Sequence, residues 1–338
     1  MKNEPLISIC IPSYNNAKYI SKTLSTLINQ TYTNTEIIVC DNKSSDNTDE
    51  VVKQFSSQKM RYIKNTENVG CYNNYNECLK YAKGEYIAFY HSDDMYLPEI
   101  VEREYKVLSA SDNIGAVFTL DNVINENDKY LYPGVSIPKE LKDRKSYGFV
   151  DVMSCLLKYQ GSFFICPTLM IKRKVFDEVG LFQVTTDLAE DTNMWLKISM
   201  HYDLGILNER LINRRISSTA GSFVYDSKRI KQADHYRVLD HFLKVSEEKG
   251  VKFPLAVLEQ YEFNKFWDNV IISRNMVIQG KVDDAKKSFY KSVNLKLLGT
   301  GLRSVSNIIK LLKTMAFIIA LKLNVAGTIL LRKKRVNK

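Results

Sequence analysis

Two kinds of hydrophobic pattern alternate along the first two hundred residues. Short runs rich in β-branched residues, typical of buried strands, are separated by segments whose apolar residues recur at helical spacing, such as Ile20, Leu24 and Leu27. Strands are expected at 6–11, 36–40, 60–64, 85–90, 115–120 and 166–171, and helices from about 16, 49, 72, 98, 174 and 190. The alternation predicts an α/β fold with a mostly parallel, Rossmann-like sheet flanked by helices.

Local signals predict where some helices begin and end. Asn15 or Asn16 is of the residue type that caps a helix N-terminus. Gly84 is expected to end the helix over 72–82, because glycine readily adopts the left-handed conformation that follows many helices.

The pattern changes twice further along the chain. Residues 121–160 are rich in loop signals, and from about 221 the patterns are helical with few turn residues. We therefore expect a first domain over 1–220, a helical region over 221–295 and a separate tail over 296–338.

The tail carries the positive charge of the protein. Thirteen Lys and Arg residues and no Asp or Glu lie from Ala285 onward, so the net charge of +10 leaves −3 for residues 1–284. A nucleic-acid groove through the body is therefore not expected. The predicted polar face of the tail helix holds Arg303, Ser306, Asn307, Lys310, Lys313 and Thr314, and the apolar face holds Val305, Ile308, Ile309, Leu311 and Leu312.

Such a basic amphipathic helix is suited to lie on an anionic membrane surface. The alternative is an ordinary helix that packs on the domain. A spanning helix over 314–331 is less favoured because Lys322 and Asn324 interrupt it. No signal peptide is recognisable, so we expect the body in the cytoplasm, attached peripherally to the inner face of the cell membrane.

Polar residues gather where three predicted strands end. Pro12-Ser13-Tyr14-Asn15 follows the first strand, Asp41 the second and Ser92-Asp93-Asp94 the fourth. Ligands of parallel α/β sheets bind outside these carboxyl ends. Neither a GxGxxG fingerprint nor a P-loop is present. Adjacent carboxylates can instead hold Mg²⁺ or Mn²⁺, which in turn binds phosphate, so we expect a metal-bridged nucleoside diphosphate.

Longer stretches around these positions resemble a known family. ISICIPSYNN at 7–16, EIIVCDNKSSDNT at 36–48, NVGCYNNYNECLKYAKGEYIAFYHSDD at 68–94 and VFDEVGLF with EDTNMWLKIS through 199 are similar, in order and spacing, to family 2 glycosyltransferases. That resemblance covers roughly 1–216. It implies a GT-A fold that binds the nucleotide sugar within 1–120 and faces the acceptor within 121–220.

The resemblance also implies a role for individual residues. Pro12 and Tyr14 would line the nucleobase pocket, and Asp41 would accept a hydrogen bond from a pyrimidine imide, which favours a UDP-sugar or a dTDP-sugar. Asp93 and Asp94 would hold the divalent cation, and Asp191 would be the catalytic base with Glu190 beside it. The remaining implied nucleotide contacts are Asn15, Asn68, Gly70, Asn76, Ser92, Asp93 and Arg214.

Two positions depart from the family pattern. His91 stands where the family commonly has Asp, as a hydrogen-bonding group for the nucleotide or as a structural histidine. Further on, Ile216 replaces a common His, so that Arg214 or Arg215 would supply the positive charge near the diphosphate. The alternative for the two arginines is a solvated surface pair.

Taken together, the residues and the resemblance predict an inverting glycosyltransferase that uses Mn²⁺ or Mg²⁺. Its acceptor would be a glycan or a lipid-linked glycan of a bacterial surface polysaccharide. The alternatives are a non-catalytic protein that binds sugar nucleotides or glycans, and a metal-dependent hydrolase on the same scaffold.

Overall fold

A computed structural model describes residues 4–55, 59–142, 144–159, 163–183, 189–217, 225, 228–294 and 297–322. The chain forms two compact units. The first comprises Met1–Val152 and Ser162–Ser217, and the second comprises Met153–Gly161 and Ser218–Lys338. The last part of the predicted tail, 323–338, lies outside the described residues.

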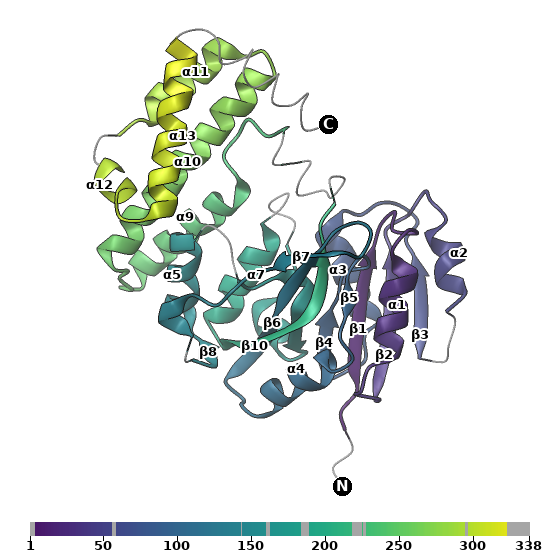
Figure 1. The fold of residues 1–338 in the computed structure, drawn as a ribbon. Helices are drawn as coiled ribbons and strands as arrows, with labels where there is room; N and C mark the ends of the chain where they lie inside the picture. Colours follow the sequence, from purple (N-terminus) through teal and green to yellow (C-terminus); the bar gives the residue numbers. More distant parts are fainter. Residues whose placement is uncertain are drawn as a thin grey trace. The chain divides into compact units, whose positions relative to one another are not determined.

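A ten-stranded sheet forms the centre of the first unit (Figure 1). Its main path runs in the order β3-β2-β1-β4-β9-β6-β10-β5, with β7 paired to β6 and β8 paired to β10. The strands are β1 (Ile7–Ser13), β2 (Thr35–Asp41), β3 (Met60–Lys64), β4 (Tyr86–Phe89), β5 (Met95–Tyr96), β6 (Ile114–Ile124), β7 (Tyr130–Pro133), β8 (Ser146–Tyr147), β9 (Leu169–Lys172) and β10 (Asp203–Arg215).

The long pairings are parallel, which confirms the predicted fold class. Strands β1 to β4 pair in parallel with one another, as do β6 and β10. Strand β9 runs antiparallel between β4 and β6, and the short strands β5, β7 and β8 are antiparallel additions. The segment predicted as a strand over 166–171 instead begins with a 3₁₀ turn over Cys166–Thr168.

The helices of the first unit follow the strands and cover the sheet. Helix α3 packs on β1 and β2, and α4 packs on β6 and β10. Their bounds are α1 (Ile20–Ile28), α2 (Thr48–Lys53), α3 (Cys71–Tyr81), α4 (Ile100–Ser109), α5 (Phe149–Tyr159), which continues into the second unit, α6 (Val175–Val179) and α7 (Glu190–Ser199). The core contains alternate residues of β1, namely Ile7, Ile9 and Ile11, all fully buried.

Two predicted helix boundaries are wrong for identifiable reasons. Helix α1 begins at Ile20 rather than beside Asn16, whose amide nitrogen donates to the Ser92 hydroxyl instead of capping the helix. Helix α3 ends at Tyr81, so Gly84 is not its terminator. A Cβ at Gly84 would lie 2.6 Å from the Leu6 carbonyl oxygen, and the glycine therefore permits close backbone approach.

The second unit is helical. Its elements include α9 (Asp234–Glu248), α10 (Leu255–Ile278), α11 (Val282–Ser292), α12 (Leu297–Gly301) and α13 (Val305–Lys322). Its core is lined by Phe263, Phe266, Val270, Val277, Ala285, Phe289 and Leu321. Among the described residues no helix combines the length and apolar character needed to cross a bilayer.

Candidate functional site

A cavity of about 300 Å³ opens at the carboxyl ends of β1, β2 and β4. Because these strands are parallel neighbours, the polar residues that follow them meet at one edge of the sheet. The lining residues are Pro12, Ser13, Tyr14, Asn16, Asn42, Asn68, Cys71, Asn74, Tyr75, His91, Ser92 and Asp93. Five of the predicted nucleotide contacts are therefore brought together, namely Pro12, Tyr14, Asn68, Ser92 and Asp93.

The β1 end offers groups that a nucleotide can use. The Tyr14 side chain is half exposed, so its ring is free to lie against a base. The Ser13 hydroxyl is buried and has no hydrogen-bond partner among the described residues. An unpaired buried hydroxyl in a cavity wall is costly, so a ligand that bonds to it would be favoured.

At the end of β2 the cavity is lined by Asn42 rather than by Asp41. Asp41 is fully buried, and its carboxylate accepts hydrogen bonds from the Ser44 backbone N–H at 2.8 Å and from the Tyr62 hydroxyl. Asn42 was not predicted, although it directly follows Asp41 at the strand end. In this arrangement the amide of Asn42 is closer to the ligand space than the carboxylate of Asp41.

Asn42 also holds the loop that precedes α3. Its amide nitrogen donates to the Asn68 side-chain oxygen at 2.8 Å, and its own oxygen accepts from the Val69 N–H at 2.8 Å. Gly70 has a φ of 86°, which a side chain would strain, and α3 begins directly after it. The predicted Asn68 and Gly70 loop thus forms one wall of the cavity.

Asn15 and Asn76 are engaged elsewhere. The Asn15 side-chain oxygen accepts from the Ser45 N–H at 2.8 Å. The Asn76 side-chain nitrogen donates to the Phe182 carbonyl at 2.8 Å, and the Asn76 side-chain oxygen accepts from the Phe182 N–H at 3.1 Å. Neither residue lines the cavity, so their contact with the nucleotide stays a prediction.

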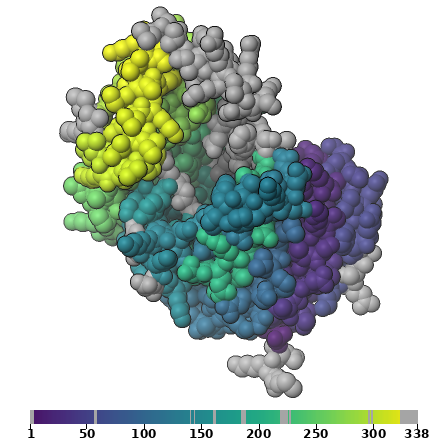
Figure 2. All heavy atoms as spheres, in the orientation of Figure 1, coloured from purple at the N-terminus to yellow at the C-terminus, as the bar shows by residue number. Residues whose placement is uncertain are grey.

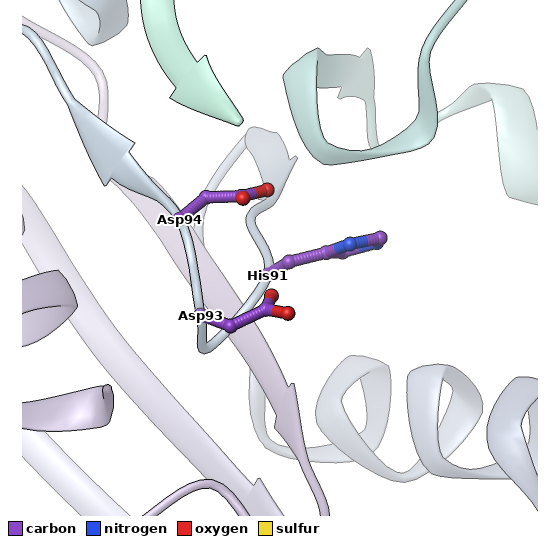
Figure 3. Close-up of side chains that lie close together, drawn as sticks. All are labelled: His91, Asp93 and Asp94. Carbon is purple, nitrogen blue, oxygen red and sulfur yellow. The ribbon is translucent and has the colours of Figure 1, made fainter. Parts of the chain in front are cut away.

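His91, Asp93 and Asp94 form a cluster on the loop after β4 (Figure 3). One possible ligand atom from each lies within 4.8 Å of the others. Burial, together with the negative charge of Asp93, raises the pKa of Asp94 well above its ordinary value. A divalent cation would offset this repulsion, and carboxylate oxygens are the ligands that Mg²⁺ and Mn²⁺ prefer. The residues therefore fit the predicted cation, with Asp93 facing the cavity.

The protein environment also determines the protonation state of His91. Its Nε2 lies 2.7 Å from the Tyr75 hydroxyl, and burial lowers the pKa of the imidazole. A neutral ring beside the carboxylates is able to accept or donate a hydrogen bond, or to bind a metal.

Arg215 holds this loop in place from inside the protein. Its Nε donates to the Asp93 carbonyl at 2.8 Å, and its backbone N–H donates to the Asp94 carboxylate at 2.7 Å. Its guanidinium is buried, pairs with Asp128 at 2.6 Å and lies over the Tyr19 ring. The interpretation of Arg214 and Arg215 as a solvated pair is therefore wrong for Arg215.

Arg214 is the more exposed of the two arginines. Its Nε donates to the buried Asp121 carboxylate at 2.8 Å, and its side chain is 31% exposed. Its positive charge acts on both His91 and Asp94, which places it near the metal cluster. It is not among the cavity-lining residues, so its predicted contact with the diphosphate stays a prediction.

The predicted catalytic pair begins α7. Glu190 is buried and accepts a hydrogen bond from the Asn193 amide at 2.9 Å. Burial raises the pKa of the Asp191 carboxyl above its ordinary value. Burial and the Asp191 charge together raise the pKa of the Cys71 thiol to about 11, and Cys71 lines the cavity. Asp191 therefore lies close to the cavity wall at the start of α3.

Comparison with known proteins identifies relatives of this chain. The family model described as glycosyl transferase family 2 matches residues 8–180. An uncharacterised glycosyltransferase of Rickettsia felis is 31% identical over 228 residues, which cover 64% of this chain and only 35% of that protein.

Two further proteins have more specific names. The Escherichia coli enzyme WfgD, a UDP-Glc:α-D-GlcNAc-diphosphoundecaprenol β-1,3-glucosyltransferase, is 38% identical over 203 residues, covering 60% of this chain and 73% of WfgD. The solved structure of a mannosyltransferase from Pyrobaculum calidifontis, in complex with GDP-Man and Mn²⁺, has a TM-score of 0.55 at 17% identity. That alignment covers 99% of this chain and 87% of the mannosyltransferase.

These findings agree with the geometry of the site. The structural match at low identity supports the GT-A fold, and the family model extends over the strands, the cavity loops and the metal cluster. This chain belongs to glycosyl transferase family 2.

Proposed function

We propose that the chain is an inverting, metal-dependent glycosyltransferase. It would move a hexosyl or N-acetylhexosaminyl group from a nucleoside diphosphate to a hydroxyl of a glycan acceptor. The observation that carries the proposal is the cavity at the strand ends. It is lined by Tyr14, Asp93 and Cys71, and the charge of Asp191 acts on the Cys71 thiol, which supports a place for Asp191 near this space.

The favoured donor is a UDP-sugar, with a dTDP-sugar as the second choice. Tyr14 offers a ring for stacking in the cavity. The resemblance implies that the Asp41 carboxylate accepts from a pyrimidine imide N–H, which would require this buried side chain to give up a present hydrogen bond with Ser44 or Tyr62. The name of WfgD, which specifies UDP-Glc, supports this choice. The mannosyltransferase with GDP-Man shares only the fold, at 17% identity.

Each carboxylate has a separate role in the reaction. When bound by Asp93, with Asp94 and His91 beside it, Mn²⁺ or Mg²⁺ supplies positive charge for the departing diphosphate. Asp191 takes the acceptor hydroxyl proton while that oxygen forms a bond to the anomeric carbon. The bond from this carbon to the diphosphate breaks, and the diphosphate keeps the electron pair. Glu190, which accepts a hydrogen bond from Asn193 of the same helix, orients Asp191 or contacts the acceptor.

The proposed acceptor is a lipid-linked glycan in the assembly of a cell-envelope polysaccharide. WfgD is named for such an acceptor, a GlcNAc-diphosphoundecaprenol. The positive tail of this chain suits the anionic inner leaflet of a cell membrane. We therefore propose that the protein works peripherally at the cytoplasmic face.

Product analysis tests this function. The full chain is incubated with Mn²⁺, a panel of UDP-, dTDP- and GDP-sugars and a short-chain GlcNAc-diphospholipid. Products are identified by mass spectrometry and their anomeric configuration by NMR. We expect transfer from a UDP-sugar with inversion at the anomeric carbon.

Matched variants separate the alternatives. Asp191→Asn should lose transfer while still binding donor, whereas Asp177→Asn, an exposed carboxylate on α6, should behave as wild type. Binding without turnover in the wild type would favour a sugar-nucleotide binding protein. Release of sugar to water that no acceptor stimulates would favour a hydrolase.

A further inference from the structure

Helix α13 lies at the surface of the second unit (Figure 2), and six of its apolar residues are exposed. Val305, Ile309 and Leu312 are 75%, 46% and 60% exposed, and Met315 and Ile319 are 58% and 57% exposed. With Ile308, these residues recur at intervals of three and four along the helix, so they form a single stripe. The stripe covers an arc of roughly 120° and extends roughly 20 Å. We call these six residues the α13 stripe.

The opposite face of the same helix holds buried polar groups. Asn307 is buried, and its amide donates to the Gln260 side chain at 2.8 Å and to the Thr300 carbonyl at 3.2 Å. Thr314 is buried as well. The sequence-based assignment of both residues to a solvent-facing polar side is therefore wrong. The polar face is fixed within the second unit, which leaves the apolar face at the surface.

The helix is anchored by its own core contacts and does not need the stripe to stay folded. Leu321 is fully buried in the core of the second unit, and Leu311, Phe317 and Ile318 pack against that core. The most exposed residues of the stripe therefore contribute little to the packing that holds α13. A surface protein segment rarely retains so large an apolar patch without a binding role.

Charge indicates what the stripe binds. Lys313 borders it on one side and Lys322 on the other, and residues 285–338 contain thirteen Lys or Arg and no acidic residue. A second copy of this helix, docked on the stripe, would bring lysines close to lysines, and their charges would repel. The Arg332-Lys333-Lys334-Arg335 segment of the same chain would be repelled in the same way. An anionic lipid surface offers an apolar layer that can bury the stripe, and negative charge that attracts the lysines beside it.

We propose that the α13 stripe docks on an anionic lipid bilayer, with the helix lying in the plane of the surface and its six apolar side chains inserted. Lys313 and Lys322 then contact lipid phosphates. This inference deepens the proposed placement at the cytoplasmic face of the membrane. Its test measures vesicle binding rather than transfer, so the two proposals can fail separately.

The experiment compares wild type with Ile309→Glu/Leu312→Glu by co-sedimentation with vesicles of phosphatidylglycerol and phosphatidylcholine, and of phosphatidylcholine alone. Leu255→Glu serves as a matched control, because Leu255 is 70% exposed on α10 and outside the stripe. Wild type and the control should bind the anionic vesicles, and the double variant should bind at least about tenfold more weakly. Circular dichroism should show all three equally folded.

A second variant separates the charge from the apolar contact. Lys313→Glu/Lys322→Glu should weaken binding to anionic vesicles and reduce its salt dependence, while binding to phosphatidylcholine vesicles stays unchanged. The proposal is overturned if wild type does not bind vesicles, or if Ile309→Glu/Leu312→Glu binds as tightly as wild type. It is also overturned if light scattering shows a wild-type dimer that this variant separates, since the stripe would then be an interface between copies.

Discussion

The two units of this protein differ in what is unusual about the residues at their proposed binding sites. The first unit buries charged groups, including Asp94 and Arg215 beside the cavity, whereas the second exposes the apolar α13 stripe. Buried charge and exposed apolar surface are both costly, and both are uncommon without a reason. The difference agrees with the two proposals, a polar ligand for the first unit and a lipid surface for the second.

Removal of the Asp93 carboxylate should give the largest effect. Asp93→Ala takes away the cavity-facing metal ligand, so transfer should fall by about a thousandfold or more. Binding of UDP, measured by calorimetry, should lose its dependence on Mn²⁺. Asp112→Ala, an exposed carboxylate before β6, is the control and should match wild type. Full activity of Asp93→Ala in the presence of a chelator would show that transfer does not need a metal held by Asp93.

Replacement of the Asp191 carboxylate should give the second largest effect. Asp191→Asn keeps the shape of the side chain but cannot take a proton, so kcat should fall about 100-fold or more with donor affinity kept. Burial raises the pKa of Asp191, so its charged form predominates only at pH values above this raised pKa. The kcat of wild type should therefore rise with pH through a range above that of an ordinary Asp. A variant that loses donor affinity but not kcat would make Asp191 a binding residue.

Two leucines of one helix sharpen the contrast within the second unit. Leu321→Ala removes a fully buried side chain and should lower the free energy of unfolding by about 2–5 kcal/mol. Leu312→Ala removes a 60% exposed one and should change it by no more than about 0.5 kcal/mol. Denaturant unfolding of both variants provides the measurement. Equal losses would show that the α13 stripe is covered by protein.

The smallest expected effect concerns Arg215, a positioning residue. Arg215→Lys keeps the charge but loses the bonds to the Asp93 and Asn125 carbonyls. Affinity for Mn²⁺, followed by electron paramagnetic resonance, should fall about tenfold, with a lower Tm. Arg103→Lys, in an exposed pair with Glu209, is the control. Unchanged Mn²⁺ affinity in Arg215→Lys would limit this arginine to a structural role.

Local patterns were enough to predict much of the fold. The strand at 60–64 has the predicted bounds, and the one predicted at 36–40 is observed as Thr35–Asp41. Strands β5 and β10 were not predicted, although β10 is a long strand, Asp203–Arg215. Strands β7 and β8 were also missed, because Tyr130–Pro133 is exposed throughout and β8 has two residues. Their pairing depends on the free edges of β6 and β10 rather than on their own sequence.

The site was predictable where residues follow a strand directly. Tyr14, Ser92 and Asp93 were expected at the cavity and line it. Asn42 was missed, and Arg215 was considered only for its charge, because their positioning roles depend on partners far along the chain, such as Val69 and Asp93. The orientation of α13, with Asn307 buried and the apolar stripe exposed, was missed for the same kind of reason. The hydrogen-bond partner of Asn307 is Gln260, on α10.

A crystal structure of the protein with UDP and Mn²⁺ tests the central claim most directly, because the anomalous signal of manganese locates the cation. The account predicts a peak about 2.2 Å from an oxygen of the Asp93 carboxylate, with the diphosphate beside it and the uracil against the Tyr14 ring. A manganese peak away from the His91, Asp93 and Asp94 cluster, or UDP bound outside the cavity at the ends of β1, β2 and β4, would contradict it.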